Sequence, residues 1–343
     1  MSVLPRSLAV IREAPSVAVL LVLRATASLL PGQVAFAVAR VCGLSTTLLS
    51  VRGFRTLGHM RKTFRLPFFL AFHTTWDYLA RPYTDFVLFR RILDGREDIS
   101  KWSIIEENAD AVKKLRGSDA PFIVATAHFA REATVTLYTP WIVPGRLKAL
   151  VVPLPAFSWR PSVLRTRLQF GQMLQIIRHI NPGAECVYTG SELKPIALVH
   201  SLLQPGTRAI IHLDATVGPN ELGSFSSPFA GHGQLAFAVG TARLARLAHC
   251  PIIPCVPRVV KHRQIELQWG EPVLPHPTKE SKQDDASVTS ELLGFFEVAI
   301  GERPSQYVLP IGEDRRWEPD RIRWSDAEDP KPTSGASCIP KAR

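Results

Sequence analysis

The apolar run from Pro121 to Ala127 is the feature that most constrains how this chain can fold. The run has the length of a strand, and apolar or small residues occupy both its odd and its even positions. A strand of this kind needs cover on both faces, as strands of parallel sheets have. Because similar short runs alternate with helical patterns further along the chain, we predict an α/β fold with a mixed, mostly parallel sheet flanked by helices. The other expected strands are residues 149–154, 183–188, 208–213, 252–256 and 265–269, and the expected helices are residues 163–179, 192–203, 233–248 and 287–301.

The N-terminal segment is both apolar and basic. Residues 1–65 contain nine Lys and Arg residues and one acidic residue, Glu13. Since the charges are interleaved with Leu, Val and Ala, they suit an anionic membrane surface better than a nucleic acid. The apolar stretch Ser16–Leu30 contains Arg24 and is shorter than the about 20 apolar residues that a membrane-spanning helix needs. We expect two consecutive helices that embed in or lie on a bilayer, and the alternative is a pair of buried core helices.

The length of 343 residues is compatible with one large α/β domain and appendages. We expect N-terminal membrane-associated helices in residues 1–52, the main domain in residues 53–323 and a disordered tail in residues 324–343, which are rich in charged residues and proline. Residues 53–117 read as helices. The five cysteines lack the spacing of a disulfide framework or zinc site, so we expect buried thiols in a reducing compartment.

Two residues at the end of the first apolar run can carry chemistry. His128 follows the run directly, and Glu132 comes four residues later. On a helix, residues at this spacing lie on one face within side-chain reach. A histidine oriented by a carboxylate can remove a proton from a hydroxyl, which then attacks an acyl group. The alternative for the same pair is an ordinary surface contact.

The order of motifs along the chain resembles that of the lipid A biosynthesis (lauroyl/myristoyl) acyltransferase family. The resemblance spans roughly residues 16 to 323 and begins with His128 and its nearby acid. Each motif is degenerate, but their joint order is fairly specific. The later motifs are the leucine-to-aspartate stretch Leu202–Asp214, the Phe-Phe-Gly-like element Pro228–Gly231, the helix Gly240–Ala248, the strand Pro251–Pro254 and the element Pro304–Tyr307.

The resemblance implies a fold like that of glycerolipid acyltransferases and an O-acyltransferase activity. Such an enzyme moves a fatty acyl chain from acyl carrier protein or coenzyme A to a hydroxyl of a lipid A-like glycolipid or another lipid acceptor. It also implies the cytoplasmic face of a bacterial inner membrane as the location, with membrane lipids as partners. No cofactor, metal or nucleic acid is expected.

The same resemblance implies roles for particular residues. His128 is the expected base, and Glu132 is expected to orient its ring and to stabilise the imidazolium. Asp214 closes a predicted strand, and Ala230 replaces an aromatic residue of the family pattern, which leaves the acyl length open. The expected substrate-binding residues are Arg131, Arg167, Asp214, Phe229 and Gly231; His232 and Arg258 are weaker candidates.

One departure from the family pattern leaves alternatives open. The family has four residues between the histidine and the acid, and this chain has three. A catalytically silent, lipid-binding relative is therefore the main alternative. A serine hydrolase is disfavoured because no Gly-x-Ser-x-Gly element occurs in the sequence.

Overall fold

The structure is a computed structural model of the whole chain. It describes residues 4–127, 129, 146–151, 172, 175–176, 179–180, 185–188, 193–213, 224–229, 232–261, 263–275 and 281–307.

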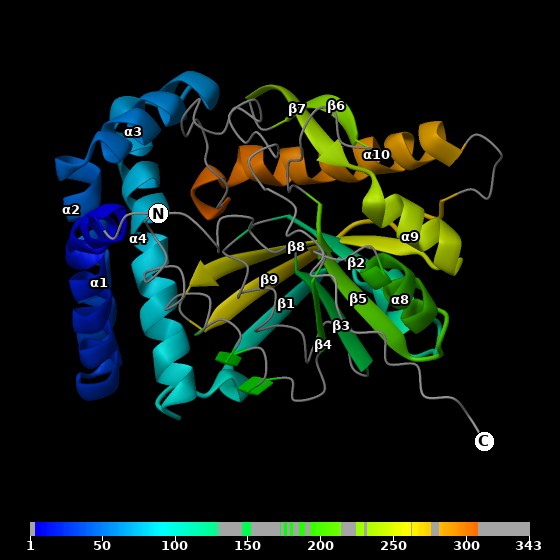
Figure 1. The fold of residues 1–343 in the computed structure, drawn as a ribbon, viewed down its shortest axis with the longest axis horizontal. Helices are drawn as coiled ribbons and strands as arrows, with labels where there is room; N and C mark the ends of the chain where they lie inside the picture. Colours follow the sequence, from blue (N-terminus) through cyan, green and yellow to red (C-terminus); the bar gives the residue numbers. More distant parts are fainter. Residues whose placement is uncertain are drawn as a thin grey trace.

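A seven-stranded sheet forms the centre of the fold (Figure 1). Its strand order is β1-β9-β8-β2-β5-β3-β4, and every neighbouring pair is parallel except the antiparallel pair β8–β9. The predicted mixed, mostly parallel sheet is therefore confirmed. The strands are β1 (Ser103–Glu107), β2 (Phe122–Thr126), β3 (Arg146–Val151), β4 (Glu185–Tyr188), β5 (Thr207–His212), β8 (Ile252–Lys261) and β9 (Gln264–Trp269).

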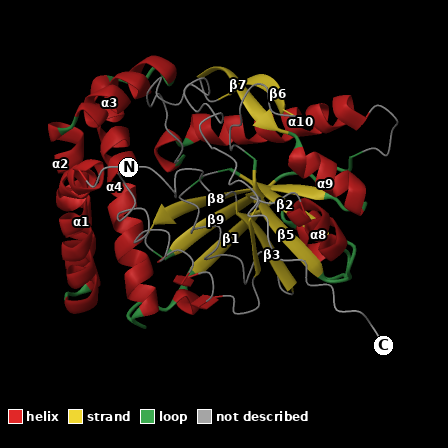
Figure 2. Ribbon diagram, in the orientation of Figure 1, coloured by secondary structure: helices red, strands yellow, loops and turns green. Residues whose placement is uncertain are grey.

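Strand β2 is buried along its whole length, as its apolar sequence predicts. Phe122 and Val124 pack into a hydrophobic cluster on one face of the sheet, with side chains of α4 and α5 (Asp110–Arg116). Ile123 and Ala125 pack into the cluster on the other face, with side chains of α8, α9 and α10. Both faces thus carry helices, and Figure 2 shows α8, α9 and α10 next to the strands. The bounds of these helices are α4 (Phe68–Leu93), α8 (Leu193–Leu202), α9 (Gly240–Ala248) and α10 (Ser281–Glu302).

The N-terminal region consists of long helices that lie beside the sheet (Figure 1). Helix α1 spans Leu4–Leu29 and α2 spans Gly32–Leu49, so the two expected consecutive helices are present, with the break at Pro31. Helix α3 (Val51–Thr63) follows, and the Ser50 side chain caps its start by accepting a hydrogen bond from the Gly53 amide at 2.9 Å. Helix α4 then runs back along α1 and α2 towards the sheet.

Arg91 of α4 ties α1 to the rest of the fold. Its guanidinium is buried, and Nη1 donates to the carbonyl oxygens of Ala27 and Leu30 at 3.2 and 3.0 Å. The last carbonyl groups of a helix have no partner within the helix, so a cation at this end satisfies them and opposes the helix dipole. The end of α1 is therefore fixed against α4.

One helix in the described part of the chain is long and apolar enough to cross a membrane by length and composition. It is α2, Gly32–Leu49, of which 22% is buried within the protein, whereas the apolar stretch Ser16–Leu29 of α1 is shorter. The domain boundary expected after residue 52 stays a prediction. The expected tail, residues 324–343, lies outside the described residues.

Two of the expected elements are wrong. The helix expected over residues 233–248 is a strand, β7 (His232–Ala238), followed by the shorter α9. Strand β7 pairs with β6 (Ser224–Phe229) in an antiparallel hairpin that the sequence analysis did not identify. A short apolar run fits either element, and this pairing decides for a strand. The expected helical region 53–117 contains the strand β1, which pairs with β9 at the edge of the sheet.

We predict that Gly43→Ala destabilises the protein although alanine favours helices. A Cβ atom at Gly43 would lie 2.3 Å from both Cα and Cβ of Ala80, so α2 and α4 would have to separate. Overpacking of this kind costs about 1–3 kcal/mol. Thermal unfolding followed by circular dichroism measures the change.

The matched control is Gly58→Ala in α3, where a Cβ atom meets nothing within 4 Å. This substitution should leave the stability unchanged or raise it by about 0.5–1 kcal/mol. Equal effects of the two substitutions would contradict the close contact between α2 and α4.

Candidate functional site

Two of the predicted site residues, His128 and Asp214, closely follow two neighbouring parallel strands, β2 and β5, which end at the same edge of the sheet. Strands β2 and β5 are parallel, with Thr126 opposite His212, and the Leu213 amide donates to the Thr126 carbonyl at 2.8 Å. His128 and Asp214 each follow two residues after this pair in the sequence. The carboxyl edge of an open α/β sheet is where ligands usually bind. This edge is therefore the candidate site.

Four buried aromatic side chains meet at this edge. Phe129, which directly follows His128, has its ring centroid 5.6 Å from that of Tyr307, and the two backbones form an antiparallel bridge. Phe229 lies 6.2 Å from Tyr307 and 5.3 Å from Phe237, between centroids. We call Phe129, Phe229, Phe237 and Tyr307 the aromatic cluster. Tilted and edge-on contacts of this kind are favourable beyond the apolar area they bury.

The aromatic cluster joins three motifs that are far apart in the sequence. Phe129 belongs to the His128 segment, Phe229 to the Phe-Phe-Gly-like element, and Tyr307 to the Pro304–Tyr307 element. Ala127 and Phe129, on either side of His128, are both fully buried. The packing therefore fixes the two residues that flank the proposed base. All four rings are buried, so the cluster is a packed support and not a cavity.

Gln306 attaches the last of these motifs to the sheet. Its side-chain oxygen accepts from the Val259 amide at 3.0 Å, and its nitrogen donates to the Val259 carbonyl at 2.8 Å. Val259 lies on β8 beyond Ile252–Pro254, the segment of β8 that pairs with β2. This clamp on β8 holds the short helix η3 (Pro304–Gln306), and with it Tyr307, against Phe129.

The predicted site residues divide into those that the structure describes and those that it does not. Phe229 is buried in the aromatic cluster. Arg258 is buried and forms ion pairs with Glu266 and Glu302, which gives it a structural role. His128, Arg131, Glu132, Arg167, Asp214 and Gly231 lie outside the described residues.

The described residues offer no candidate metal site, and their buried thiol at Cys250 is unreactive. No group of three or more His, Cys, Asp or Glu side chains there could hold a metal ion. Cys250 and Cys255 are free and buried, and burial raises the pKa of the Cys250 thiol to about 12. Because the thiolate is the reactive form, Cys250 stays inert near neutral pH.

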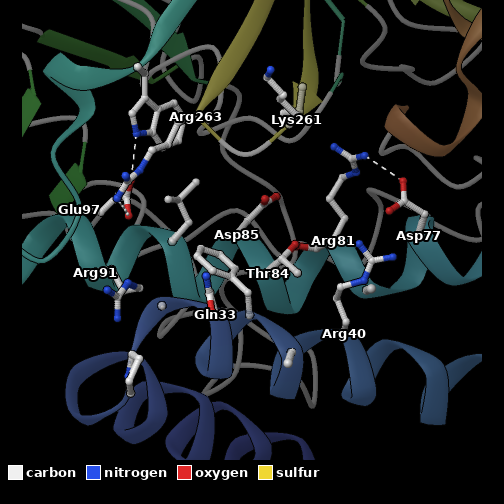
Figure 3. Close-up of a pocket in the computed structure, with 18 residues that line it drawn as sticks. Gln33, Arg40, Asp77, Arg81, Thr84, Asp85, Arg91, Glu97, Lys261 and Arg263 are labelled. Atoms are coloured by element: carbon white, nitrogen blue, oxygen red, sulfur yellow. Dashed lines mark hydrogen bonds and ion pairs between the residues drawn. The ribbon is translucent and has the colours of Figure 1, made fainter.

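A pocket of about 930 Å³ lies between α2, α4 and the turn that joins β8 to β9 (Figure 3). The sequence analysis did not identify it. Its polar side chains along α4 include Asp77, Arg81, Thr84 and Asp85, which recur at helical spacing within an otherwise apolar helix. This polar stripe on α4 is the one sign of the pocket in the local sequence. It does not reveal the other wall, which comes from Val259, Lys261 and Arg263, about 180 positions later.

The chain was compared with known proteins. No protein-family model matches it, and neither does any curated protein. Among solved structures, the crystal structure of the 1-acyl-sn-glycerophosphate (LPA) acyltransferase PlsC from Thermotoga maritima is similar at 14% sequence identity and a TM-score of 0.34, covering 75% of this chain and 97% of that one. A likeness this distant carries neither family nor activity across. The lipid A family stays a prediction from the sequence.

We predict that Gln306→Ala lowers both stability and any activity of the site. The substitution leaves the part-buried amide and carbonyl of Val259 without their partner, and an unsatisfied group costs up to about 1–3 kcal/mol. Chemical denaturation measures the loss. The neighbouring Ser305→Ala is the control and should behave as wild type, and equal stability of the two variants would contradict the clamp.

Proposed function

We propose that this protein is a membrane-associated lipid O-acyltransferase. The observation that carries the proposal is the convergence of three family-like motifs on the aromatic cluster beside His128. Motifs that are separated by up to 178 positions, from Phe129 to Tyr307, thus meet at one sheet edge, which supports a shared site there. In finer detail, we propose a lipid A-like glycolipid as acceptor and an acyl thioester of acyl carrier protein or coenzyme A as donor.

The proposed reaction needs no nucleophile from the protein. His128 takes the proton from the acceptor hydroxyl while the oxygen of that hydroxyl attacks the carbonyl carbon of the thioester. The C–S bond then breaks, the acyl group remains as an ester, and the thiolate leaves with the proton from the imidazolium. Glu132 holds the ring and stabilises its charged form.

The exposed apolar residues support membrane association through the N-terminal helices. Of the eighteen large, exposed apolar residues in the described part of the chain, twelve lie in α1–α4 or the turns between them. Several meet at the end of the helical layer where α3 lies, and Phe69 and Leu49 there are each 84% exposed. Basic residues share this end, namely Arg52, Arg55, Arg61, Lys62 and Arg65. Apolar and basic side chains together suit the interface of an anionic bilayer. We propose the cytoplasmic face of a bacterial inner membrane.

We predict that His128→Ala lowers acyl transfer by about 10²–10⁴-fold, the usual loss for a general base. Glu132→Gln should lower it less, since the amide can still orient the ring. The measurement is thiol release from an acyl thioester by the purified full chain with a lipid extract as acceptor. His200→Ala on α8 is the control, because His200 is exposed and α8 leads into the amino end of β5, whereas the candidate site is at the carboxyl end.

The three-residue interval between His128 and Glu132 favours a second candidate, a silent lipid-binding relative. The same assay separates the two. Wild-type protein that binds lipid but releases no thiol above a protein-free blank supports the silent relative and would falsify the enzyme.

We predict that replacing Phe69 and Leu49 together by serine releases protein from membranes. Burying a Phe or Leu side chain contributes about 1.5–3 kcal/mol, so the loss should shift the partition strongly towards the soluble fraction. Flotation with vesicles containing anionic lipid measures it. Val298→Ser is the control, since Val298 is 64% exposed but lies on α10. An unchanged partition of the double variant would contradict attachment through this end.

A further inference from the structure

The pocket between α2, α4 and the β8–β9 turn carries an excess of positive charge. Five cationic side chains line it against three acidic ones, an excess of two positive charges. The cationic residues are Arg40, Arg81, Arg91, Lys261 and Arg263, and the acidic residues are Asp77, Asp85 and Glu97. Three cations have protein partners: Arg81 pairs with Asp77, Arg263 pairs with Glu97, and Arg91 binds the end of α1.

Arg40 and Lys261 are not neutralised by a carboxylate within the described part of the chain. Arg40 is nevertheless held in position, because its guanidinium lies 5.0 Å from the Trp76 ring centroid and its carbonyl accepts from the Trp76 indole at 2.9 Å. This stacking leaves the charge of Arg40 uncompensated. Figure 3 shows Arg40 rising from α2, Lys261 coming from β8 on the opposite wall, and Arg81 between them.

Two arginines of the pocket also have unused donors. The Nε atoms of Arg81 and Arg91 are buried and have no acceptor among the described residues. A buried donor without a partner is costly, and a bound acceptor would remove that cost. Donors from three elements around one pocket suit a ligand with several acceptor oxygens better than a single carboxylate.

We infer that this pocket binds a phosphate ester, with the phosphate between Arg40 and Lys261. A phosphomonoester carries about −1.5 to −2 charges at neutral pH and three acceptor oxygens, which matches the excess of two positive charges. Arg81 contributes its free Nε–H as a further donor. The volume of about 930 Å³ is far larger than a phosphate group, so the rest of the ligand also lies in the pocket.

The apolar part of the lining indicates a lipid as the source of the phosphate. Phe36, Ala37, Leu88 and Val259 line the pocket beside the charged groups. On α2, the exposed Val34 and Val41 lie on the helix face next to the one that carries Gln33, Ala37 and Arg40. A lipid with its headgroup in the pocket would therefore have an apolar surface for its chains.

The pocket is mechanically joined to the candidate active site. Val259 lines the pocket, and its backbone is the group that Gln306 clamps. Tyr307, the next residue, belongs to the aromatic cluster beside His128. Binding itself does not depend on the proposed acyl transfer, so the two ideas can fail separately.

The test is calorimetric titration of the full chain in a neutral detergent. The probes are dioctanoyl phosphatidic acid, dioctanoyl phosphatidylcholine and glycerol 3-phosphate. Phosphatidic acid should bind the wild type more tightly than phosphatidylcholine does, and the variant Arg40→Gln with Lys261→Gln should weaken it about tenfold or more. Both residues are exposed, so apart from the loss of the contact between Arg40 and Trp76 the variant should unfold close to the wild-type temperature. Phosphatidic acid binding tighter than glycerol 3-phosphate assigns a lipid source, and the reverse assigns a soluble ester in the same site.

The control is Lys113→Gln with Lys114→Gln on α5, which removes the same charge from exposed positions outside the pocket. This variant and His128→Ala should both bind phosphatidic acid as wild type does. Equal affinity of the Arg40 and Lys261 double variant and the wild type would overturn the inference, as would equal binding of phosphatidic acid and phosphatidylcholine. If the wild-type protein binds phosphatidic acid but transfers no acyl group, the proposed enzyme activity is wrong and the binding site stands.

Discussion

The burial of β2 between two parallel neighbours is the constraint on which the rest of the structure depends. Five consecutive buried residues, with ladders to β5 on one side and β8 on the other, fix the centre of the sheet. Alternate side chains of β2 pack against the helices on the two faces of the sheet. If β2 moved by one residue relative to its neighbours, the side chains of each face would point to the other face. The register therefore determines where the chain emerges before His128.

The second requirement is a link between the sheet and the distant motifs. The Gln306 clamp on Val259 provides it, because it brings Tyr307 to Phe129 from the far end of the described chain. The same segment of β8 forms one wall of the charged pocket. Site, clamp and pocket thus share one piece of backbone. Helix α2 supplies the opposite wall of the pocket, and α4 lies between them and holds the end of α1 through Arg91.

The fold could be predicted where local sequence determines it. The apolar run of β2 and the break at Pro31 both gave elements that the structure contains. The segment His232–Ala238 could not be predicted, since its strand state depends on pairing with β6. Of the site, the motifs at Phe229 and Tyr307 were identifiable, but their contact was not, because it depends on tertiary packing. The pocket combines Arg40 with Lys261, which no local pattern connects.

The central claim is that a base at the carboxyl end of β2 activates the acceptor hydroxyl. The most direct measurement is the pH dependence of kcat/KM for thiol release by the wild type and by His128→Gln. An unperturbed histidine has a pKa of about 6.5, so the wild-type rate should rise with pH through the region around that value and then level off. The variant should be slower and should lack this rise. A variant that keeps the same rise, at any absolute rate, would contradict the assignment of His128 as the base.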